Sequence, residues 1–438
     1  MSYDTIKFFN LEDYANIIES IDLIKENAIL SCDLTLKRRN EPCPSCHSNN
    51  PIVHGYYSKK IAHSISSCSR CFIIYHSRRY KCRFCKKIYY EKNPFSSGKD
   101  QTSTYTILAV LNALRSHTST FTSVAAEFFI TKQQVMAIFD SYVECAKKPL
   151  PSIICVDEFY TSKLSKYKYA CTILDFQTKE IVEIYRSRRM DYLANAFTSI
   201  PDWERNNVKM VIIDMWESYK DLIHRYFKMA IVAVDSFHVI KQLNEAIIKI
   251  RIKVMNKFDK RTNKLNSNDM YYYMLKKFHY FFVKNYEDIS TGYIRIHKIK
   301  AKWKKDEILK YLLSIDDDLK YAYQLKERYR EFNLTANYGS CKDEFERLIY
   351  EFNNSHIEEL RTFGKLLKHW KTEIINSFLR VDGKRLSNGA IEGVNSRIKT
   401  IIKNANGFIN FNRLRNKIIY SINKDVPIKG IPNKKDKV

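Results

Sequence analysis

The sequence contains little glycine or proline and no long apolar run. Glycine and proline number 10 and 9 among 438 residues, while lysine, isoleucine, asparagine and tyrosine are abundant. We read this bias as an AT-rich coding background, which carries no information about function. No apolar run approaches the roughly 18 residues of a membrane span, and the first residues include acids and lack the apolar segment of a secretory signal. We therefore expect a cytoplasmic protein with no membrane contact and no disulfide framework.

Acidic residues are also few in comparison with basic ones. The chain has 48 aspartates and glutamates against 74 lysines and arginines, a formal net charge of +26. Codon bias can exchange arginine for lysine, but it does not explain this excess. A strongly basic globular protein usually binds a polyanion, most often a nucleic acid, with an anionic membrane surface as the lesser alternative. The length of the chain allows two to four domains with a real hydrophobic core.

Four of the eleven cysteines have the spacing of a zinc site. Cys43 and Cys46 form one CxxC pair, and Cys82 and Cys85 form another. The segment around them has short runs of alternating apolar and polar residues and too few apolar residues for a core of its own. It therefore needs a cross-link such as a structural metal ion. Two such pairs complete a closed tetrahedral site for one structural Zn²⁺, with Zn–S bonds of about 2.3 Å. The alternative, four reduced cysteines buried as small hydrophobic residues, fits such regular pairs poorly.

A third pair, Cys68 and Cys71, has no equally clear role. We favour a turn with spare thiols. The alternative is a second metal site completed by a histidine from the set His47, His54, His63 and His76.

Basic residues between the outer cysteine pairs include Arg78, Arg79 and Lys81. They predict either a contact with DNA phosphates or merely a solvated face.

The residues from 96 to 148 have a helical period and predict three helices with a short turn before the third. Thr131 as N-cap, with Gln134 three residues later, gives a capping-box pattern at the start of the third helix. This arrangement matches a helix-turn-helix, whose third helix enters the major groove of DNA. Its reading end would be Lys132, Gln133 and Gln134. The alternative is a plain three-helix linker.

From residue 149 onward, apolar strands alternate with helices, which predicts a mixed α/β sheet. Asp157, Asp214 and Asp235 each end an apolar strand. Functional sites in α/β sheets lie at the carboxyl ends of the strands, although a single acid there is more often a helix N-cap or a loop residue. From about residue 238 to 380 nearly all of the sequence predicts basic helices.

Glu392 adds an acid on a predicted helix near the end of the chain. The apolar residues of this helix recur at near-helical spacing and mark its buried side; they are Ile391, Val394, Ile398 and Ile401. Glu392 lies on another stripe, with Asn395 and Lys399. The helix can therefore pack on a sheet and still direct Glu392 along the edge of that sheet. The alternative is a polar face without a role.

Four motifs together resemble the transposases of bacterial insertion sequences. They are IICVDEFY, VIIDMWESY, VAVDSFHV and SNGAIEGVNSRIKTIIKNANGFINF. In particular the chain resembles the ISL-three family, whose members carry a DDE-type transposase domain. The segment CPSC…RRYKCRFC is similar to the N-terminal zinc finger of that family, and the expected helix-turn-helix follows it. The resemblance covers nearly the whole chain, and the DMW and NGAIEGVN motifs are its most specific parts.

The resemblance implies functional roles for five residues. Asp157, Asp214 and Glu392 would be the metal-binding triad, and Asp235 and His238 would be an accessory acid and histidine. The alternatives are a helix N-cap for Asp235 and a simple packing role for His238.

The resemblance also implies a multidomain α+β fold with a ribonuclease-H-like α/β catalytic core that a large all-helical insertion interrupts. We expect a helical lead (1–35), a zinc-finger β module (36–95), a helix-turn-helix (96–148), the catalytic core (149–240 and 380–425), the helical insertion (241–379) and a basic tail (426–438).

The implied activity is DNA transposition, which needs in-line displacements at phosphorus. Two Mg²⁺ or Mn²⁺ ions held by three carboxylates can activate the attacking oxygen and stabilise the leaving one, while Arg397, Lys399 and Lys403 hold DNA. We expect double-stranded partners, both terminal inverted repeats and target DNA, and a dimer or larger assembly on DNA. The alternatives are a non-catalytic DNA-binding regulator descended from a transposase, a metal-dependent nuclease of the same fold and, less favoured, an RNA-processing enzyme.

Overall fold

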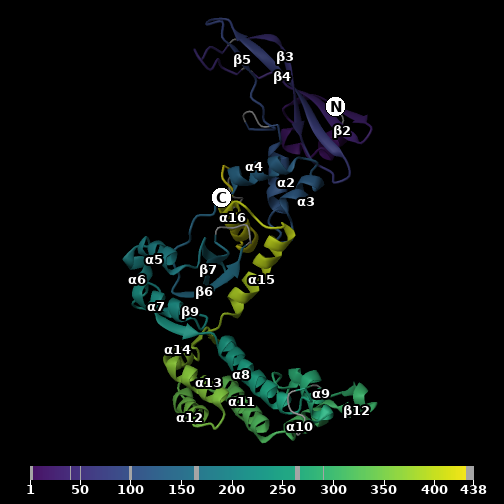
Figure 1. Ribbon diagram of the computed structural model, residues 1–438. Coiled ribbons are helices and arrows are strands. Elements are labelled where there is room, and N and C mark those ends of the chain that lie inside the picture. The colour runs from purple at the N-terminus through teal and green to yellow at the C-terminus, as the bar shows by residue number, and fades with distance from the viewer. Residues whose placement is uncertain are drawn as a thin grey trace. The chain divides into compact units, whose positions relative to one another are not determined.

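The computed structural model describes residues 3–39, 41–49, 51–97, 101–161, 167–261, 267–289 and 291–430. The chain divides into two compact units (Figure 1). The first unit consists of Met1–Lys147, Phe159–Tyr169 and Val394–Val438, and the second consists of Lys148–Glu158 and Ala170–Gly393. No helix within the described ranges is long and apolar enough to cross a membrane. The expected basic tail lies outside the described residues from 431 onward.

The first unit contains a twisted five-stranded sheet in the order β1-β2-β4-β3, with β5 paired to β4. The sheet follows a short helix and a 3-10 turn, and its elements are α1 (Tyr3–Phe8), η1 (Glu12–Tyr14), β1 (Ile18–Glu26), β2 (Ile29–Leu36), β3 (Pro51–Ala62), β4 (Arg70–Cys82) and β5 (Ile88–Tyr90). Ile61, Ile73 and Tyr75 from the cysteine-rich segment join Phe9 and Leu34 from the N-terminal part in one buried cluster. The cysteine-rich segment therefore shares a hydrophobic core with the N-terminal residues.

The prediction of a helical lead over residues 1–35 was wrong beyond α1. Residues 18–36 form the antiparallel pair β1 and β2. A bulge between Ile18 and Ser20 shifts the register by one residue, so the buried side chains of Ile18 and Ile21 have the three-residue spacing of a helix although they belong to a strand.

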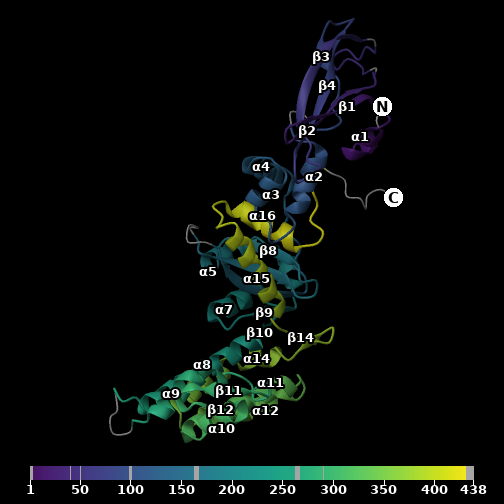
Figure 2. The same cartoon turned by 90° about the vertical axis from the view of Figure 1, so that its right-hand side faces the viewer.

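Three helices follow the sheet, as the sequence predicted: α2 (Thr104–Ala113), α3 (Phe121–Glu127) and α4 (Lys132–Tyr142). The capping box at the start of α4 is confirmed, because the Thr131 side chain accepts from the Gln134 N–H and the Gln134 side chain accepts from the Thr131 N–H. Helix α16 (Phe411–Ile422) packs on α4 and on the residues that follow α2 (Figures 1 and 2). The rings of Phe139 and Tyr420 meet edge to face at 5.8 Å. The sequence had grouped α16 with the catalytic core instead.

The second unit is built on a five-stranded sheet in the order β10-β9-β6-β7-β8. Strands β6, β9 and β10 are parallel, and β7 and β8 are antiparallel. The elements are β6 (Ile153–Tyr160), β7 (Tyr169–Asp175), β8 (Ile181–Tyr185), α5 (Met190–Thr198), α6 (Asp202–Asn206), β9 (Met210–Ile213), α7 (Glu217–Tyr226) and β10 (Ile231–Val234). The three parallel strands are mostly apolar and buried, which is typical of strands covered on both faces.

A long helical block leaves this sheet through α8 (Ser236–Lys257) and returns through α14 (Lys371–Asn376). Between them lie α9 (Asp269–Lys277), η2 (His279–Phe281), β11 (Tyr293–Ile296), η3 (His297–Ile299), β12 (Ala301–Lys304), α10 (Lys305–Leu313), α11 (Asp317–Thr335), α12 (Cys341–Asn353) and α13 (Glu358–His369). Helices α11 and α13 pack along α8 (Figure 1). The short pair β13 (Arg380–Val381) and β14 (Lys384–Arg385) then leads into α15 (Gly389–Asn404).

The prediction of an all-helical insertion was wrong at one place. Tyr293–Ile296 and Ala301–Lys304 form an antiparallel hairpin. Lys300 adopts a left-handed backbone conformation with φ 53°, which a continuing helix does not allow. Lys298, Lys300, Lys302 and Lys304 recur at every second position, which is a strand period that the prediction of basic helices did not use.

Candidate active site

Three aspartates lie in a row across three neighbouring strands of the second unit. The last paired residues of β6 and β9 are Cys155 and Ile212, and Asp157 and Asp214 each follow two positions later. The last paired residues of β9 and β10 are Ile213 and Val234, so Asp214 and Asp235 each follow one position later. The Asp235 N–H donates to the Ile213 carbonyl at 3.1 Å, which continues this register. Asp214 and Asp235 follow the ends of β9 and β10. The prediction that Asp157 also ends its strand was wrong, because β6 continues to Tyr160. The matching registers still place the three carboxylates side by side near the carboxyl edge of the parallel strands.

This row of acids is electrostatically strained. Burial, followed by the charge of Asp214, raises the pKa of Asp157 to about 7. Burial also raises the pKa of Asp235, against the opposing effect of His238. Both shifts show that the folded chain disfavours a full set of negative charges here. A bound cation would remove that penalty.

His238 and Glu392 join the row. His238 lies in the first turn of α8, and its Nε2 is 3.0 Å from the Asp214 Oδ1. This hydrogen bond raises the pKa of His238. Glu392, in the first turn of α15, is exposed. Ligand atoms of Asp235, His238 and Glu392 lie within 4.8 Å of one another, so a cation could touch all three.

The structure answers two of the alternatives raised by the sequence. Asp235 occupies the N-cap position of α8, as one alternative predicted, but its side chain makes no capping hydrogen bond to that helix. His238 is half-buried and contacts Asp214 through its ring nitrogen, so it is not a simple packing residue. The five residues named by the sequence are therefore placed around one edge of the sheet.

Asn388 is a residue of this site that the sequence analysis missed. Its side chain is fully buried, and its Nδ2 donates to the Asp214 Oδ1 at 3.0 Å. The Glu392 N–H donates to the Asn388 carbonyl at 2.9 Å. One residue thus binds the strand-end acid through its side chain and the glutamate helix through its backbone. The available signal was its position four residues before Glu392 in the NGAIEG motif.

A second missed group lies beside Asp157. Glu158 forms an ion pair with Arg188 and accepts a hydrogen bond of 3.3 Å from the Tyr219 hydroxyl. The Arg188 guanidinium also lies 5.3 Å from the centre of the Trp216 ring. This network ties the end of β6 to α7, so it holds the strand-end residues in place.

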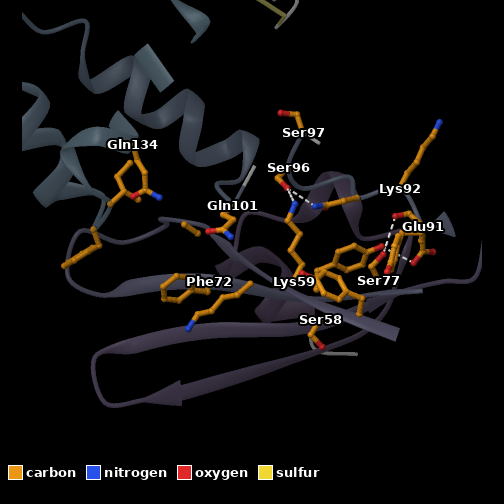
Figure 3. Close-up of a pocket in the computed structure, with 18 residues that line it drawn as sticks. Ser58, Lys59, Phe72, Ser77, Glu91, Lys92, Ser96, Ser97, Gln101 and Gln134 are labelled. Atoms are coloured by element: carbon orange, nitrogen blue, oxygen red, sulfur yellow. Dashed lines mark hydrogen bonds between the residues drawn. The ribbon is translucent and has the colours of Figure 1, made fainter. Parts of the chain in front are cut away.

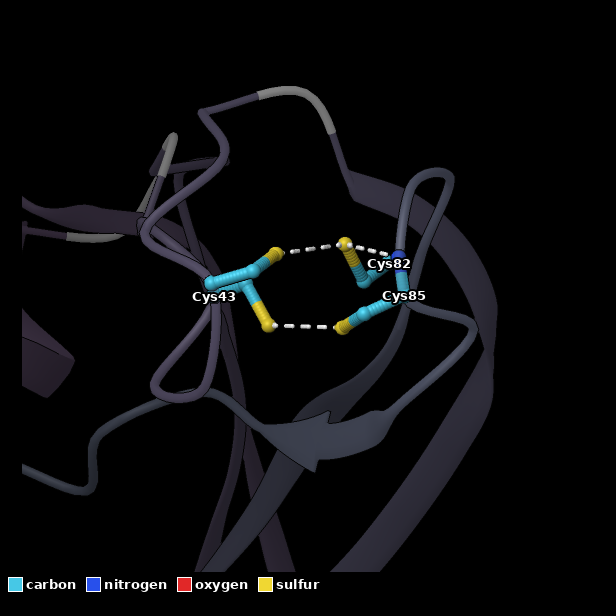
Figure 4. Close-up of side chains that lie close together, drawn as sticks. Cys43, Cys82 and Cys85 are labelled. Atoms are coloured by element: carbon cyan, nitrogen blue, oxygen red, sulfur yellow. Dashed lines mark hydrogen bonds between the residues drawn. The ribbon is translucent and has the colours of Figure 1, made fainter.

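The first unit contains a separate group of four thiols (Figure 4). The Sγ atoms of Cys43 and Cys85 are 3.6 Å apart, and those of Cys46 and Cys82 are 3.5 Å apart. Four Zn–S bonds of about 2.3 Å imply tetrahedral edges of about 3.8 Å. The N–H groups of Cys85 and Phe84 lower the pKa of Cys82 to about 6, which favours the thiolate that binds metal. The donor set therefore fits a closed zinc site.

Cys68 and Cys71 are not part of such a group. Cys68 is exposed and Cys71 is buried. Among the described residues, neither belongs to a set of three or more possible metal ligands. His63, one of the proposed partners, instead bonds the Ser103 side chain and the Phe9 carbonyl.

The predicted DNA contacts differ in their accessibility. Seven of the nine have an exposed or half-exposed side chain: Lys81 of β4, Lys132, Gln133 and Gln134 in the first turn of α4, and Arg397, Lys399 and Lys403 on α15. Arg79 is half-buried, and its Nε donates to the His54 carbonyl at 3.1 Å.

Arg78 requires a correction. It is only 4% exposed, and its guanidinium bonds Glu19, Glu91 and the Leu36 carbonyl. These partners come from distant parts of the chain, so no local pattern indicates them. Arg78 stabilises the sheet and does not present its charge to a phosphate in this structure.

Comparison with known proteins identifies the family to which the chain belongs. Residues 154–418 match the ISL-three family model, described as Transposase. The "Transposase for insertion sequence element IS1001" of Bordetella parapertussis is 22% identical over 256 residues, which cover 58% of this chain and 57% of that protein. The chain thus spans little more than half the length of this relative. Because the family match covers more than half of the chain and includes all five residues of the candidate site, the protein belongs to the ISL-three family of DDE transposases.

Proposed function

We propose that the protein is the transposase of a bacterial insertion sequence. It would bind terminal inverted repeats and catalyse metal-dependent DNA strand cleavage and strand transfer. The observation that carries this proposal is the convergence of Asp157, Asp214 and Asp235 with Glu392 at one edge of the sheet in the second unit. A set of carboxylates held by strands and a helix is suited to bind the cations that phosphoryl transfer requires.

Asp157, Asp214 and Glu392 would hold two Mg²⁺ or Mn²⁺ ions. The donor set fits, because these hard cations prefer carboxylate oxygen and the pKa of Asp157 is raised by burial and by Asp214. When bound, such a pair activates the attacking oxygen and stabilises the leaving oxygen. His238 bonds Asp214 and would orient its carboxylate.

The order of the strands supports a ribonuclease-H-like core. Strand β6 lies in the middle of the sheet, with the antiparallel partners β7 and β8 on one side and the parallel partners β9 and β10 on the other. The first three strands in the chain are thus consecutive in space, and the next two follow on the opposite flank. Asp157 lies in the central strand β6, and Asp214 follows the end of its parallel neighbour β9, near the carboxyl edge where sites in α/β sheets form.

The first unit supports binding to duplex DNA. Its α3 and α4 are joined by a short turn, and the exposed first turn of α4 carries Lys132, Gln133 and Gln134. The chain has a net charge of +26, which favours a polyanion. We propose that this unit recognises the terminal repeats, that the protein works as a dimer or larger assembly on DNA, and that it acts in the bacterial cytoplasm, where its substrate lies.

A strand-transfer assay tests the proposal. Purified protein, Mg²⁺ or Mn²⁺ and a labelled duplex ending in the terminal repeat are mixed with a supercoiled target plasmid. We expect joined products from the wild type and none from Asp157→Asn, Asp214→Asn or Glu392→Gln, while all three variants still bind the repeat. Asp343→Asn, at an exposed position on α12, is the matched control and should remain active.

The same assay separates the two rival functions. A metal-dependent nuclease would nick the plasmid without joining ends. A non-catalytic regulator would bind the repeat and leave both DNAs intact. Full activity of Glu392→Gln would show that the triad is wrongly assigned.

A further inference from the structure

A wide groove in the first unit lies between the sheet and the start of α4. Its volume is about 1240 Å³, which exceeds the roughly 300–1,000 Å³ of a typical small-molecule site. Figure 3 shows Phe72 and Lys59 on the sheet side and Gln134 of α4 across from them. The groove is separate from the zinc site and from the carboxylate row, and its lining combines aromatic rings, lysines and small polar side chains.

The charge of the groove favours an anion. Lys59, Lys60 and Lys92 line it. The single acid in the lining, Glu91, has a fully buried side chain and is paired with Arg78. Its charge is therefore neutralised inside the protein, and the groove presents a net positive surface that suits a phosphate backbone.

The rings of the groove are unusually exposed for aromatic residues in a sheet. Tyr57 of β3 and Tyr90 of β5 are 58% and 54% exposed, and their rings meet edge to face at 5.9 Å. They lie on either side of β4, where Ser77 is the register partner of Tyr57. Another ring of the lining, Phe72, has its centre 4.1 Å from the Lys60 ammonium. Aromatic faces next to lysines are the features by which proteins hold unpaired bases.

We propose that this groove binds unpaired single-stranded DNA, with bases stacked on Tyr57 and Tyr90 and phosphates paired with Lys60 and Lys92. A duplex keeps its bases stacked on one another and offers no base face to these rings, so the groove is suited to a melted or frayed strand next to the duplex that α4 would read. The inference rests on the proposed function for the origin of that strand, which would come from the end of the transposon.

The test is a binding measurement that needs no cleavage. The full-length, zinc-loaded protein is titrated without Mg²⁺ into fluorescein-labelled oligothymidylate of 12 nucleotides, an abasic strand of the same length, the matching oligouridylate RNA and a terminal-repeat duplex. We expect the thymidylate strand to bind at least about tenfold tighter than the abasic strand, since each stacked base contributes substantially to affinity. Failure of strand transfer would leave this result unaffected.

Substitutions then locate the site. Tyr57→Ala with Tyr90→Ala should weaken thymidylate binding at least about tenfold, whereas Tyr57→Phe with Tyr90→Phe should retain it, because the rings remain. Tyr350→Ala, which removes a ring that is 70% exposed on α12, is the matched control and should leave thymidylate binding unchanged.

The lysines are tested by the salt dependence of binding. Lys60→Gln with Lys92→Gln should reduce the slope of log K against log salt concentration by about 1.4, that is, about 0.7 for each phosphate that no longer meets a lysine.

Zinc content and duplex binding show whether each variant is folded. Three outcomes would overturn the proposal: equal affinity for the thymidylate and abasic strands, wild-type affinity of the double alanine variant, or at least tenfold tighter binding of the RNA strand. The last outcome would identify RNA as the ligand of the groove.

Discussion

The Asn388 side chain donates a hydrogen bond of 3.0 Å to Asp214, a residue 174 positions earlier in the chain. Its carbonyl accepts the N–H of Glu392. Asn388 therefore fixes the start of the glutamate helix against the strand-end acid. The two elements that the proposed metal site needs are joined by one fully buried amide.

This relationship predicts a kinetic defect for Asn388→Ala. Without the amide, Asp214 keeps its hydrogen bond to His238, but the start of the helix that carries Glu392 is no longer bonded to Asp214. Substitution of groups that orient a metal ligand usually costs 10- to 100-fold in metal affinity or activity. We expect such a loss in strand cleavage, with part of it recovered at high Mn²⁺ concentration. Asn354→Ala, at an exposed helix end, is the control, and unchanged cleavage by Asn388→Ala would refute the positioning role.

The four-thiol group predicts one zinc ion per chain. Cys43→Ser or Cys82→Ser should remove the ion, because a closed site needs all four ligands, and should destabilise the sheet segment and weaken binding to the terminal repeat. Metal content by plasma mass spectrometry measures the first effect, and fluorescence anisotropy measures the second. Cys68→Ser removes an exposed thiol outside the group and should retain both zinc and binding; loss of zinc from this variant would contradict the ligand set.

Arg385 predicts a stability effect in the second unit. Its guanidinium bonds the Asn333 and Ser377 carbonyls at 2.5 and 3.0 Å and lies 3.7 Å from the centre of the Phe378 ring. Lysine cannot reproduce the planar, multidentate contacts of the guanidinium, so Arg385→Lys should lower the free energy of unfolding by about 1.5–3 kcal/mol, the range for hydrogen bonds to a charged group. Chemical denaturation checks this. Arg380→Lys, at an exposed position nearby, should cost little.

Lys417 predicts a pH dependence in the first unit. This buried lysine of α16 bonds the Leu114 and Ser116 carbonyls and the Ser421 hydroxyl, and burial lowers its pKa to about 7. Above pH 7 the unfolded chain, with the usual lysine pKa of about 10.4, binds more protons than the folded one, so stability rises with pH.

Lys417→Met removes the contribution of this amine to the pH dependence of stability. The difference in stability between wild type and variant therefore reports the titration of Lys417 alone. We expect the free energy of unfolding of the wild type to rise relative to that of the variant between pH 7 and 9, by at most about 1.4 kcal/mol per pH unit. Chemical denaturation at each pH measures this difference. Lys424→Met, at an exposed position, should run parallel to the wild type. A constant difference between wild type and Lys417→Met would show that the amine does not titrate in this range.

The elements with strong local signals were predictable from the sequence. The apolar strands before Asp157 and Asp214, the capping box at Thr131 and the apolar stripe of α15 all follow from neighbouring residues, and the structure contains each of them. The four-cysteine group was equally predictable, because the spacing of each CxxC pair alone places two thiols close together. These features depend on local chemistry, which a sequence displays directly.

The remaining features depend on residues that are far apart in the chain. The bulge at Ile18 gave a strand the period of a helix, and the partners of Arg78 lie up to 59 residues away. The packing of α16 on the helices of the first unit joins positions about 300 residues apart. Nothing in a local pattern shows such contacts, because burial there is decided by which distant segment covers the side chain.

The distance between Asp214 and Asn388 also has a consequence during protein synthesis. At about 5–20 residues per second, roughly 9–35 s pass between the synthesis of these two residues. The strands that carry the aspartates can emerge and pair during this interval, while the glutamate helix does not yet exist. Until its final segment leaves the ribosome, a nascent chain would therefore lack Glu392, and under the proposed function an unfinished copy could not cut DNA.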